Sequence, residues 1–396
     1  MVLCYFDVSW LSTRFWDLFG VHIYNFHTKK IQLFFSGALL LTCMYNFVFA
    51  SRVISVLLNK EYDGSLFFNT RVIIPRIVAF QCFLSRLLLL FKIKKRELGK
   101  SKNITTPYES FLKTFPGEVN GLKKISFQVV LLIAILYLPL DIYKLYNIFN
   151  SSSYFVFIFY LFMNFQHISS FCLELGFFMH CYSIYIKMKS VNVDLEYLKK
   201  DTIIKNKYPL IINSSTRTST NDYSSDLRKY DQPMIYLISN VRVKHQILRK
   251  TITNLNYMYG TSVGISVCSY WVLAVCILYL QFIRKVNSYS LDEFLSSFIR
   301  CIWVADFVTR FLVITVIAHF TTKEACKSEL LVIHINNRYL NSHIQEELQI
   351  FLSQLNSSKK SMEFTAGGFF TINFHLISSH PLICQYYFNL MNKSLE

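Results

Sequence analysis

The chain has 396 residues, of which 53% are hydrophobic, 17% are aromatic and only 16% are charged, and its mean hydropathy is +0.34. A soluble chain of this length carries more charge, so the composition predicts an all-α polytopic membrane protein. The net charge of +17 does not indicate a nucleic-acid partner, because the basic residues lie in loops between apolar segments, where they set membrane topology. The lipid bilayer is therefore an expected partner, and no nucleic acid is.

Seven segments are apolar enough to cross a bilayer as helices, each of which needs about 20 residues. Pro75 and Arg86 interrupt the second segment, and His380 and Pro381 interrupt the seventh. Polar residues within a span usually face the protein interior, so the prediction of seven transmembrane helices stands. The segments are 31–58, 72–91, 125–149, 154–186, 257–283, 294–320 and 369–390.

Lys and Arg are distributed unevenly between the two sets of connecting loops. The loops 1–30, 92–124, 187–256 and 321–368 contain 30 of them, whereas 59–71, 144–153, 284–293 and 391–396 contain 6. Since positively charged loops stay on the inner side, the N-terminus is predicted to be cytoplasmic and the C-terminus extracellular. A G-protein-coupled receptor, one alternative, has the opposite orientation. A secondary transporter, the other alternative, would show paired Gly/Pro interruptions in two matching halves, which we do not find.

Several amphipathic stretches extend the predicted spans beyond the bilayer. Apolar residues at three- and four-residue spacing mark them at 187–205, 235–256, 321–340 and 344–355. They predict either a cytoplasmic anchor bundle that assembles subunits or helices lying on the inner leaflet. The Ser/Thr-rich stretch between Asn206 and Gln232 lacks this periodicity and is predicted to be a disordered loop.

The predicted organisation follows directly from these segments. It comprises a cytoplasmic N-terminus (1–30), helices 1–4 (31–186), helix extensions with the loop (187–256), helices 5–6 (257–320), anchor helices (321–368), the last helix (369–390) and an extracellular tail (391–396).

No enzyme signature is present, because the sequence has no His-Glu-x-x-His, no Gly-rich phosphate loop and no Gly-x-Ser-x-Gly elbow. The ten cysteines are scattered without a Cys-x-x-Cys pair, so they indicate neither a disulfide framework nor a metal site. We therefore expect no catalysis, no cofactor and no metal. Gly260 and Gly264 form a small-xxx-small pattern, which predicts close helix packing and needs no other function.

Aromatic and polar side chains in the outer halves of the predicted spans form a candidate ligand pocket. Such side chains are what a small-molecule site needs, although any aromatic-rich bundle shows the same composition. Asp306 and Arg310 lie four residues apart on one helical face, so they can pair, either beside the pocket or as a structural clasp. The pocket candidates are Tyr137, Asp141, Tyr160, Asn164, His167, Tyr270, Trp271, Trp303 and Asp306.

The stretch 362–378 begins Met-Glu-Phe-Thr-Ala-Gly-Gly-Phe-Phe-Thr-Ile-Asn. It resembles the start of the last helix of the insect gustatory receptors, within the insect chemoreceptor superfamily. The resemblance implies a homo- or hetero-tetramer around a central cation pore that the seventh helices line. It also implies gating by a small-molecule tastant in the plasma membrane of a sensory neuron. The pore-lining residues that it implies are Phe369, Phe370, Ile372, Asn373, Gln385 and Phe388.

After Ser379 the sequence departs from this family's pattern. The family's last helix ends in a Thr-Tyr pair, an apolar run and Gln-Phe, whereas this chain lacks the Thr-Tyr and carries Pro381. Gln385 and Phe388 stand nearest to the Gln-Phe pair. A proline within a helix removes a backbone donor and kinks the helix. We therefore expect a pore that conducts poorly or only beside other subunits.

Overall fold

The structure is a computed structural model whose named helices confirm the all-α prediction. It describes residues 30–58, 65–98, 141–150, 152–207, 223–285, 291–335, 342–357 and 362–376, and isolated positions at 15–16, 19, 111, 114–115, 124, 127–128, 131, 135, 139 and 340. Within this part, an isolated bridge between Thr365 and Thr371 is the β pairing present. The helices are α2 (Lys30–Leu58), α3 (Leu66–Leu98), α6 (Tyr154–Lys207), α8 (Tyr223–Lys285), α9 (Leu291–Ile333) and α10 (Ser342–Asn356).

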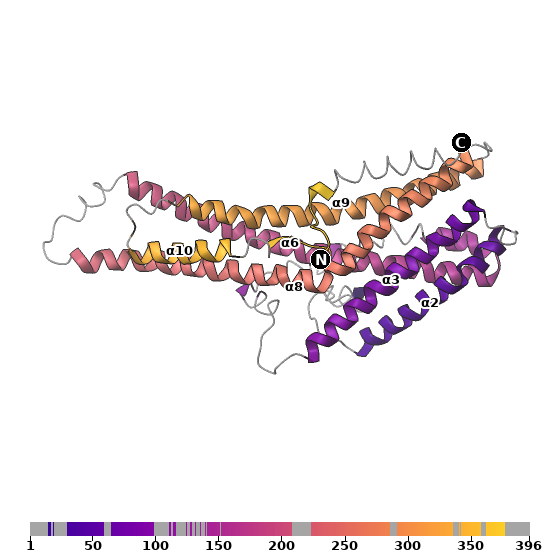
Figure 1. Cartoon of the computed structure of the whole chain (residues 1–396), viewed down its shortest axis with the longest axis horizontal. Helices are drawn as coiled ribbons and strands as arrows, with labels where there is room; N and C mark the ends of the chain where they lie inside the picture. The colour runs from indigo at the N-terminus through magenta and orange to yellow at the C-terminus, as the bar shows by residue number, and fades with distance from the viewer. Residues whose placement is uncertain are drawn as a thin grey trace, which may run out of the picture.

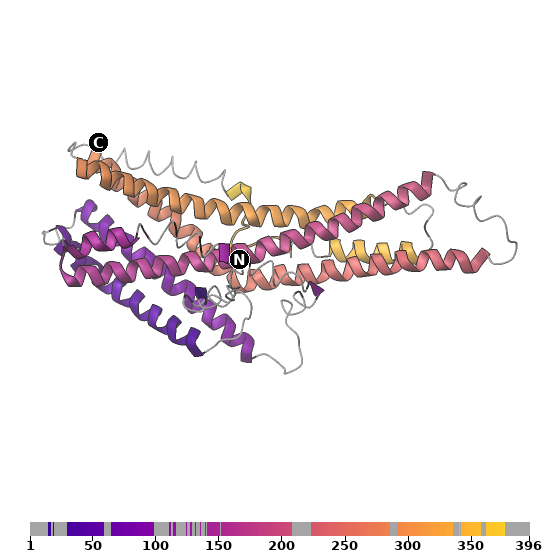
Figure 2. The ribbon, with the colours of Figure 1, turned by 180° about the vertical axis from the view of Figure 1, so that it is seen from behind.

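Three helices run along most of the molecule. α6, α8 and α9 contain 54, 63 and 43 residues, which corresponds to about 80, 95 and 65 Å at the α-helical rise. The hydrocarbon core of a bilayer is only about 30 Å thick, so each helix continues far beyond it. α2 and α3 pack beside these helices at one end of the molecule, and α10 packs at the other (Figures 1 and 2). The helical extensions predicted at 187–205 and 235–256 are confirmed.

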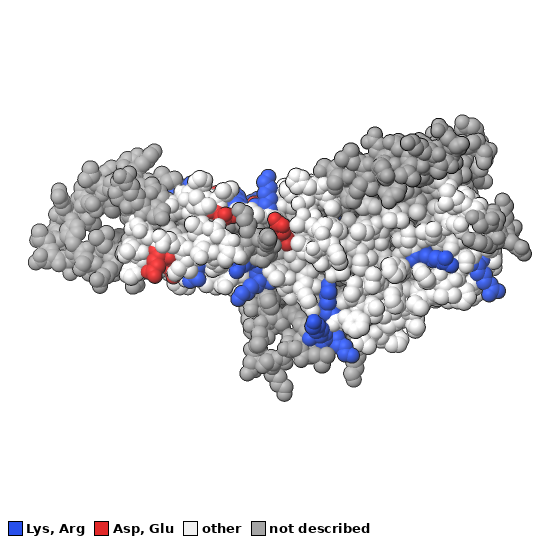
Figure 3. Space-filling model, in the orientation of Figure 1, with Lys and Arg blue, Asp and Glu red and all other residues white. Residues whose placement is uncertain are grey.

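Within the described residues, five helices are long and apolar enough to cross a membrane, namely α2, α3, α6, α8 and α9. Of the other two predicted spans, 125–149 is described only in part, with 141–149 helical, and 369–390 is described only as far as 376. Phe34 and Leu41 on α2 are more than 70% exposed, as lipid-facing side chains are. On the face drawn in Figure 3, acidic side chains appear only over the half that contains α10, while the coloured residues of the other half are mostly white with several Lys and Arg side chains. This half is the part suited to a bilayer.

Two helix boundaries differ from the prediction. α8 begins at Tyr223, so the disordered-loop prediction is wrong for 223–232, and 208–222 lies outside the described residues. Adding residues to an existing helix costs far less than nucleating one, so a stable α8 can extend into a polar stretch. α9 ends at Ile333 instead of continuing to 340. The N–H of Ile335 bonds the carbonyl of Val332, which tightens the end of the helix.

The helix α10 buries one face against α8 and α9. Its buried residues are Ile344, Leu348, Phe351 and Leu355, at the spacing of one helical face. Arg242 Nε on α8 donates to Glu347 Oε2 at 3.1 Å, beside this apolar seam. The amphipathic stretch therefore belongs to a bundle of helix extensions, and the alternative of a helix lying on the inner leaflet does not fit it.

A tight turn, residues 362–373, precedes the last predicted span, and we call it the bridged turn. Gly367 and Gly368 have φ angles of 63° and 86°, which lie in the left-handed region that glycine tolerates. The N–H of Ile372 donates to the carbonyl of Phe364 at 2.8 Å. Nearer the tip of the turn, the N–H of Ala366 donates to the carbonyl of Phe370, also at 2.8 Å. The glycine pair thus reverses the chain.

The prediction that the last helix starts at Phe369 is wrong. Helical residues begin at Phe374, and the side chain of Asn373 accepts the N–H of His375 at 3.1 Å as an N-cap. Hydropathy could not reveal this boundary, because the turn itself is as apolar as the span that follows it.

The bridged turn docks on a small-residue face of α8. The side-chain amide of Asn256 donates to the carbonyl of Glu363 at 2.7 Å and accepts the N–H of Thr365 at 3.2 Å. A Cβ at Gly260 would lie 2.5 Å from the Thr365 carbonyl oxygen, and one at Gly264 would lie 2.8 Å from a side-chain carbon of the turn. The glycine pair is therefore closely packed, but against the bridged turn and not against a second helix as the sequence predicts.

Substitution of Gly260 tests this docking. Gly260→Ala should destabilise the fold by about 1–3 kcal/mol, because the added methyl group displaces the backbone of the turn. Gly37→Ala is the matched control, since no atom lies within 4 Å of that position in α2. It should stabilise the helix by up to about 1 kcal/mol. Thermal unfolding of the detergent-solubilised variants measures both effects, and equal melting temperatures would contradict the docking.

Candidate functional site

Two long helices, α6 and α9, face each other through a band of polar and aromatic side chains, which we call the α6–α9 stripe. Successive members follow at three- or four-residue spacing on each helix, with Phe307 adjoining Asp306 on α9, so each set shares one helical face. The stripe consists of Tyr160, Asn164, His167, Phe171 and Glu174 on α6, and Trp303, Asp306, Phe307 and Arg310 on α9.

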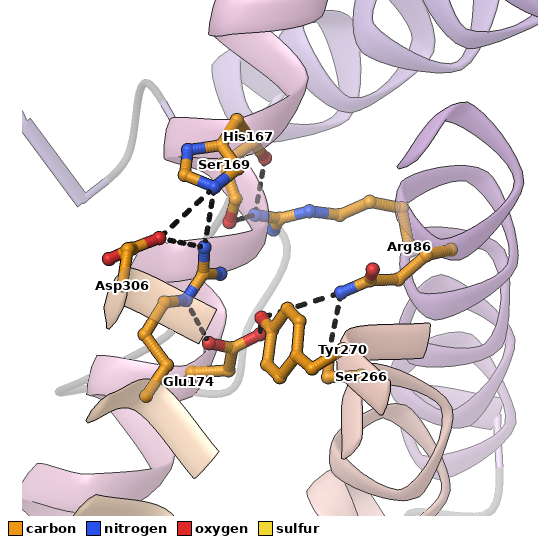
Figure 4. Close-up of polar contacts among 9 residues, drawn as sticks. Arg86, His167, Ser169, Glu174, Ser266, Tyr270 and Asp306 are labelled. Atoms are coloured by element: carbon orange, nitrogen blue, oxygen red, sulfur yellow. Dashed lines mark hydrogen bonds and ion pairs between the residues drawn. The ribbon is translucent and has the colours of Figure 1, made fainter. Parts of the chain in front are cut away.

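Arg310 contacts both acidic residues of the stripe, Glu174 and Asp306, which Figure 4 labels. Its Nε donates to Glu174 Oε2 at 2.9 Å, and its Nη1 lies 3.5 Å from Asp306 Oδ2. The pairing of Asp306 with Arg310 that the sequence predicts is thus confirmed. Arg310 and Glu174 are 4% and 3% exposed. Charges this deeply buried are tolerated when they are paired and hydrogen-bonded.

His167 joins the same network as a neutral ring. Its Nε2 lies 2.8 Å from Nη1 of Arg310 and 3.4 Å from Oδ2 of Asp306. Because an arginine N–H can only donate, Nε2 must accept, which assigns the imidazole proton to Nδ1. The ring also packs edge-on against Trp303, with centroids 4.7 Å apart.

Side chains from α3 and α8 complete the network. The Tyr270 hydroxyl donates to the carboxylate of Glu174, and Gln81 Nε2 donates to Ser266 Oγ at 3.1 Å. The guanidinium of Arg310 lies 4.7 Å from the centre of the Tyr270 ring, within cation–π range. One polar cluster therefore connects α3, α6, α8 and α9.

A small cavity of about 10 Å³ lies against this cluster, which is room for about one water molecule. Nη2 of Arg310 has no hydrogen-bond partner within the described residues. Its lining combines apolar walls with a few convergent polar groups, which is the composition of a small-molecule site but not its size. In the same part of the chain, no group of His, Cys, Asp and Glu is placed to hold a metal ion. The cavity is lined by Val78, Gln81, His167, Ser170, Tyr270, Leu273, Phe307 and Arg310.

At the far end of the stripe, a second cation lies between aromatic rings. Nζ of Lys144 is 4.7 Å from the centre of the Trp303 ring and 5.3 Å from that of Tyr160. Asp141, one turn before Lys144 on its helix, is buried and interacts electrostatically with Lys144, His167 and Asp306. Lys144 itself is only half-buried.

The structure brings most of the predicted pocket residues together. Trp271 lies apart from the cluster, because its ring packs edge-on against Phe311 at 5.2 Å. Tyr137 lies outside the described residues. The residues that gather along the stripe or beside the cavity are Asp141, Tyr160, Asn164, His167, Tyr270, Trp303 and Asp306.

The predicted pore residues lie in the bridged turn or beyond it. Phe369 is 87% exposed at its tip, whereas Ile372 is 2% exposed within the core of the chain. Phe370 is half-buried against that core, and Asn373 caps the following helix. Gln385 and Phe388 lie outside the described residues.

Sequence reasoning missed Glu174 and Gln81 and treated Arg86 only as a defect in a span. Arg86 is 1% exposed, and its guanidinium donates to the carbonyl and the hydroxyl of Ser169, both at 2.6 Å. The available signal was an ionisable residue within an apolar segment, which by default marks a site. Glu174 also lies seven residues after His167, on the same face of the helix.

Removing one member of the central ion pair should be costly. Arg310→Met should destabilise the fold by about 3–5 kcal/mol, because Glu174 is left buried and unpaired. The double variant Arg310→Met/Glu174→Gln should recover part of that loss, because it removes the charge of Glu174 that the single variant leaves unpaired. The control, Lys327→Met, breaks an exposed 2.8 Å pair with Glu196 on the same two helices and should change little. Thermal unfolding compares all three, and a double variant less stable than Arg310→Met would contradict the pairing.

Comparison with known proteins gives one family and one fold. A family model described as 7tm Chemosensory receptor matches residues 11–379. Comparison with curated protein sequences gives no match. The structure of the insect olfactory receptor OR5 from Machilis hrabei in complex with eugenol has a TM-score of 0.56 at 11% sequence identity, over 98% of this chain and 99% of that chain. A second structure of OR5 has a TM-score of 0.55 at 10% sequence identity, over 97% of this chain and 99% of that chain. At this identity the likeness shows a shared fold.

Proposed function

We propose that this chain, which belongs to the 7tm chemosensory receptor family, is a gustatory receptor subunit. It would act as a tastant-gated cation channel in the plasma membrane of a sensory neuron. The observation that carries the proposal is the Arg310 cluster, which lies buried between apolar helices and beside a cavity. Ionisable residues inside a membrane bundle usually mark a ligand or ion site. Family membership favours this function over the G-protein-coupled receptor and transporter alternatives.

The geometry suggests how a ligand acts. A cavity with room for one water cannot hold a tastant, so binding requires the walls to separate and favours a second arrangement of the helices. Tyr270 on α8 shares the carboxylate of Glu174. Gly260, on the same helix and about 15 Å away along its axis, holds the bridged turn. Movement of α8 would therefore reach the start of the last segment directly.

The tetramer implied by the family resemblance has surfaces available to it. On the helix extensions, large apolar side chains face outward, including Tyr236 at 75%, Tyr197 at 66% and Leu330 at 58% exposure. Such exposed apolar surface on a folded chain marks a contact site. We propose that these extensions are cytoplasmic and bind like or related subunits, and that the last segments line the central pore.

An odorant-gated channel is the second candidate. It is favoured by the fold shared with a receptor described as olfactory and bound to eugenol. Both candidates place the ligand site and the pore in the same positions, so they differ in ligand alone.

Glycosylation tests the proposed orientation. Asn150 lies in a sequon on the predicted outer side, and Asn213 lies in one on the predicted inner side. We expect Asn150→Gln to abolish an endoglycosidase-sensitive mobility shift at that site and Asn213→Gln to leave the glycan pattern unchanged. A glycan on Asn213 would reverse the topology.

Patch-clamp recording tests the channel itself. We would compare this chain with a chimera whose residues after Ser379 are the usual last-helix end of the family, each expressed alone and exposed to a tastant panel. The chimera should carry a ligand-evoked cation current, and the native chain a smaller one or none, because Pro381 disrupts its pore helix. Silence from both, with surface expression and ligand binding demonstrated, would contradict the channel.

A further inference from the structure

The outer end of the α6–α9 stripe is built as a site for an ammonium group. Trp303 and Tyr160 come from different helices, yet both rings lie within 6 Å of the same cation, Lys144 Nζ. Two aromatic faces around one ammonium form the arrangement by which proteins recognise amines. The lysine of a third helix fills it in this structure.

The charges around this cage are unequal. Arg310 makes its shortest contact to a carboxylate, 2.9 Å, with Glu174. Its Nη1 also lies 3.5 Å from Asp306, so Arg310 faces two carboxylates. Asp141 is buried and interacts electrostatically with Lys144, and His167 is neutral, so it balances neither Asp141 nor Asp306. These three carboxylates outnumber the two cations that they face, Arg310 and Lys144, which favours a further cation in the stripe.

A buried amide also points to a ligand. Asn164 lies between Tyr160 and His167 on the same face of α6 and is 4% exposed. Neither its nitrogen nor its oxygen has a hydrogen-bond partner within the described residues. Buried polar groups are almost always paired, so an amide in this state marks a place for a further donor or acceptor. The amide oxygen can accept an N–H from an ammonium.

Of the two cations in the stripe, Lys144 is the replaceable one. Arg310 is buried and contacts Glu174, His167 and Asp306 together. Lys144 is half-buried on a flexible side chain, which can carry its charge into water with little loss of packing.

We propose that the ligand of this receptor is an amine, with an ammonium group and an apolar body. The ammonium replaces that of Lys144 between Trp303 and Tyr160, while the body occupies the enlarged cavity beside Val78 and Leu273. This rests on the proposed function only in taking the stripe as the ligand site. Displacement of Lys144 would break the contacts that its ammonium makes with Tyr160 on α6 and Trp303 on α9, which couples the occupant of the cage to the contacts between these helices.

Equilibrium dialysis with the purified full-length receptor in lipid nanodiscs tests the ligand class. The probes are 2-phenylethylamine, 2-phenylethanol and phenylacetate, which share a phenyl body and a two-carbon or shorter spacer but differ in charge. At pH 7 the amine should bind at least about tenfold more tightly than the alcohol, because it alone gains the aromatic cage and the excess carboxylate charge of the stripe. Phenylacetate should bind most weakly.

Variants then locate the site. Asp306→Asn should weaken amine binding by about tenfold or more and change alcohol binding little, because it removes charge and keeps the shape. Lys144→Met should tighten amine binding by about threefold to tenfold, because it vacates the cage and leaves Asp141 without its ammonium partner. Lys144→Arg keeps a competing cation in the cage, so its affinity for the amine should stay near that of the native chain. Lys327→Met is the control on α9 and should have no effect.

Equal binding of amine and alcohol would overturn the proposal, and so would tighter binding of phenylacetate, failure of all three probes to bind, or weaker amine binding by Lys144→Met. None of these outcomes depends on current. Amine binding without current would support the ligand class and count against the channel. Current evoked by a neutral tastant, with no preference for amines, would support the channel and count against the ligand class.

Discussion

The ion pair between Arg310 and Glu174 is the contact on which the rest of the bundle depends. Neither charge can be left alone in a medium of low polarity, so α6 and α9 are fixed in the one register that joins them. The carboxylate then holds the Tyr270 hydroxyl, and through it α8. A single buried charge therefore aligns helices that apolar packing alone would allow to slide, because apolar side chains gain similar contacts in several registers.

That alignment gives α8 its second role. In the middle of α8, Tyr270 hydrogen-bonds to the ion-paired cluster. The small-residue face of α8, from Asn256 to Gly264, binds the bridged turn by hydrogen bonds and by close packing against its backbone. A backbone-to-backbone contact transmits displacement with less loss than one through flexible side chains. The start of the last segment is thus positioned by the helix that also contacts the cavity, so the two regions cannot rearrange independently.

The sequence predicted what depends on spacing along one helix and missed what depends on register between helices. The Asp306–Arg310 pair and the buried face of α10 are local patterns, and both were confirmed. The close packing at Gly260 was also expected, but its partner is a turn and not a helix. The partner of Arg310 was missed because nothing in the chain places Glu174 opposite it across a helix interface. The start of the last helix was misplaced at Phe369 because hydropathy does not distinguish an apolar turn from an apolar helix. The loop prediction failed at Tyr223 because composition underestimates how far an existing helix extends.

The arrangement of charge in the stripe separates stability from responsiveness. Arg310 is fully enclosed and has several partners. A ligand that displaced it would disrupt the fold and could not transmit a signal. Lys144 lies at the edge of the same network, half-buried, held by two rings and facing an excess of carboxylate. A cation from solution can compete there without breaking the central pair. A receptor needs such a division, because a group that must stay in place for folding cannot also be the group that a ligand displaces.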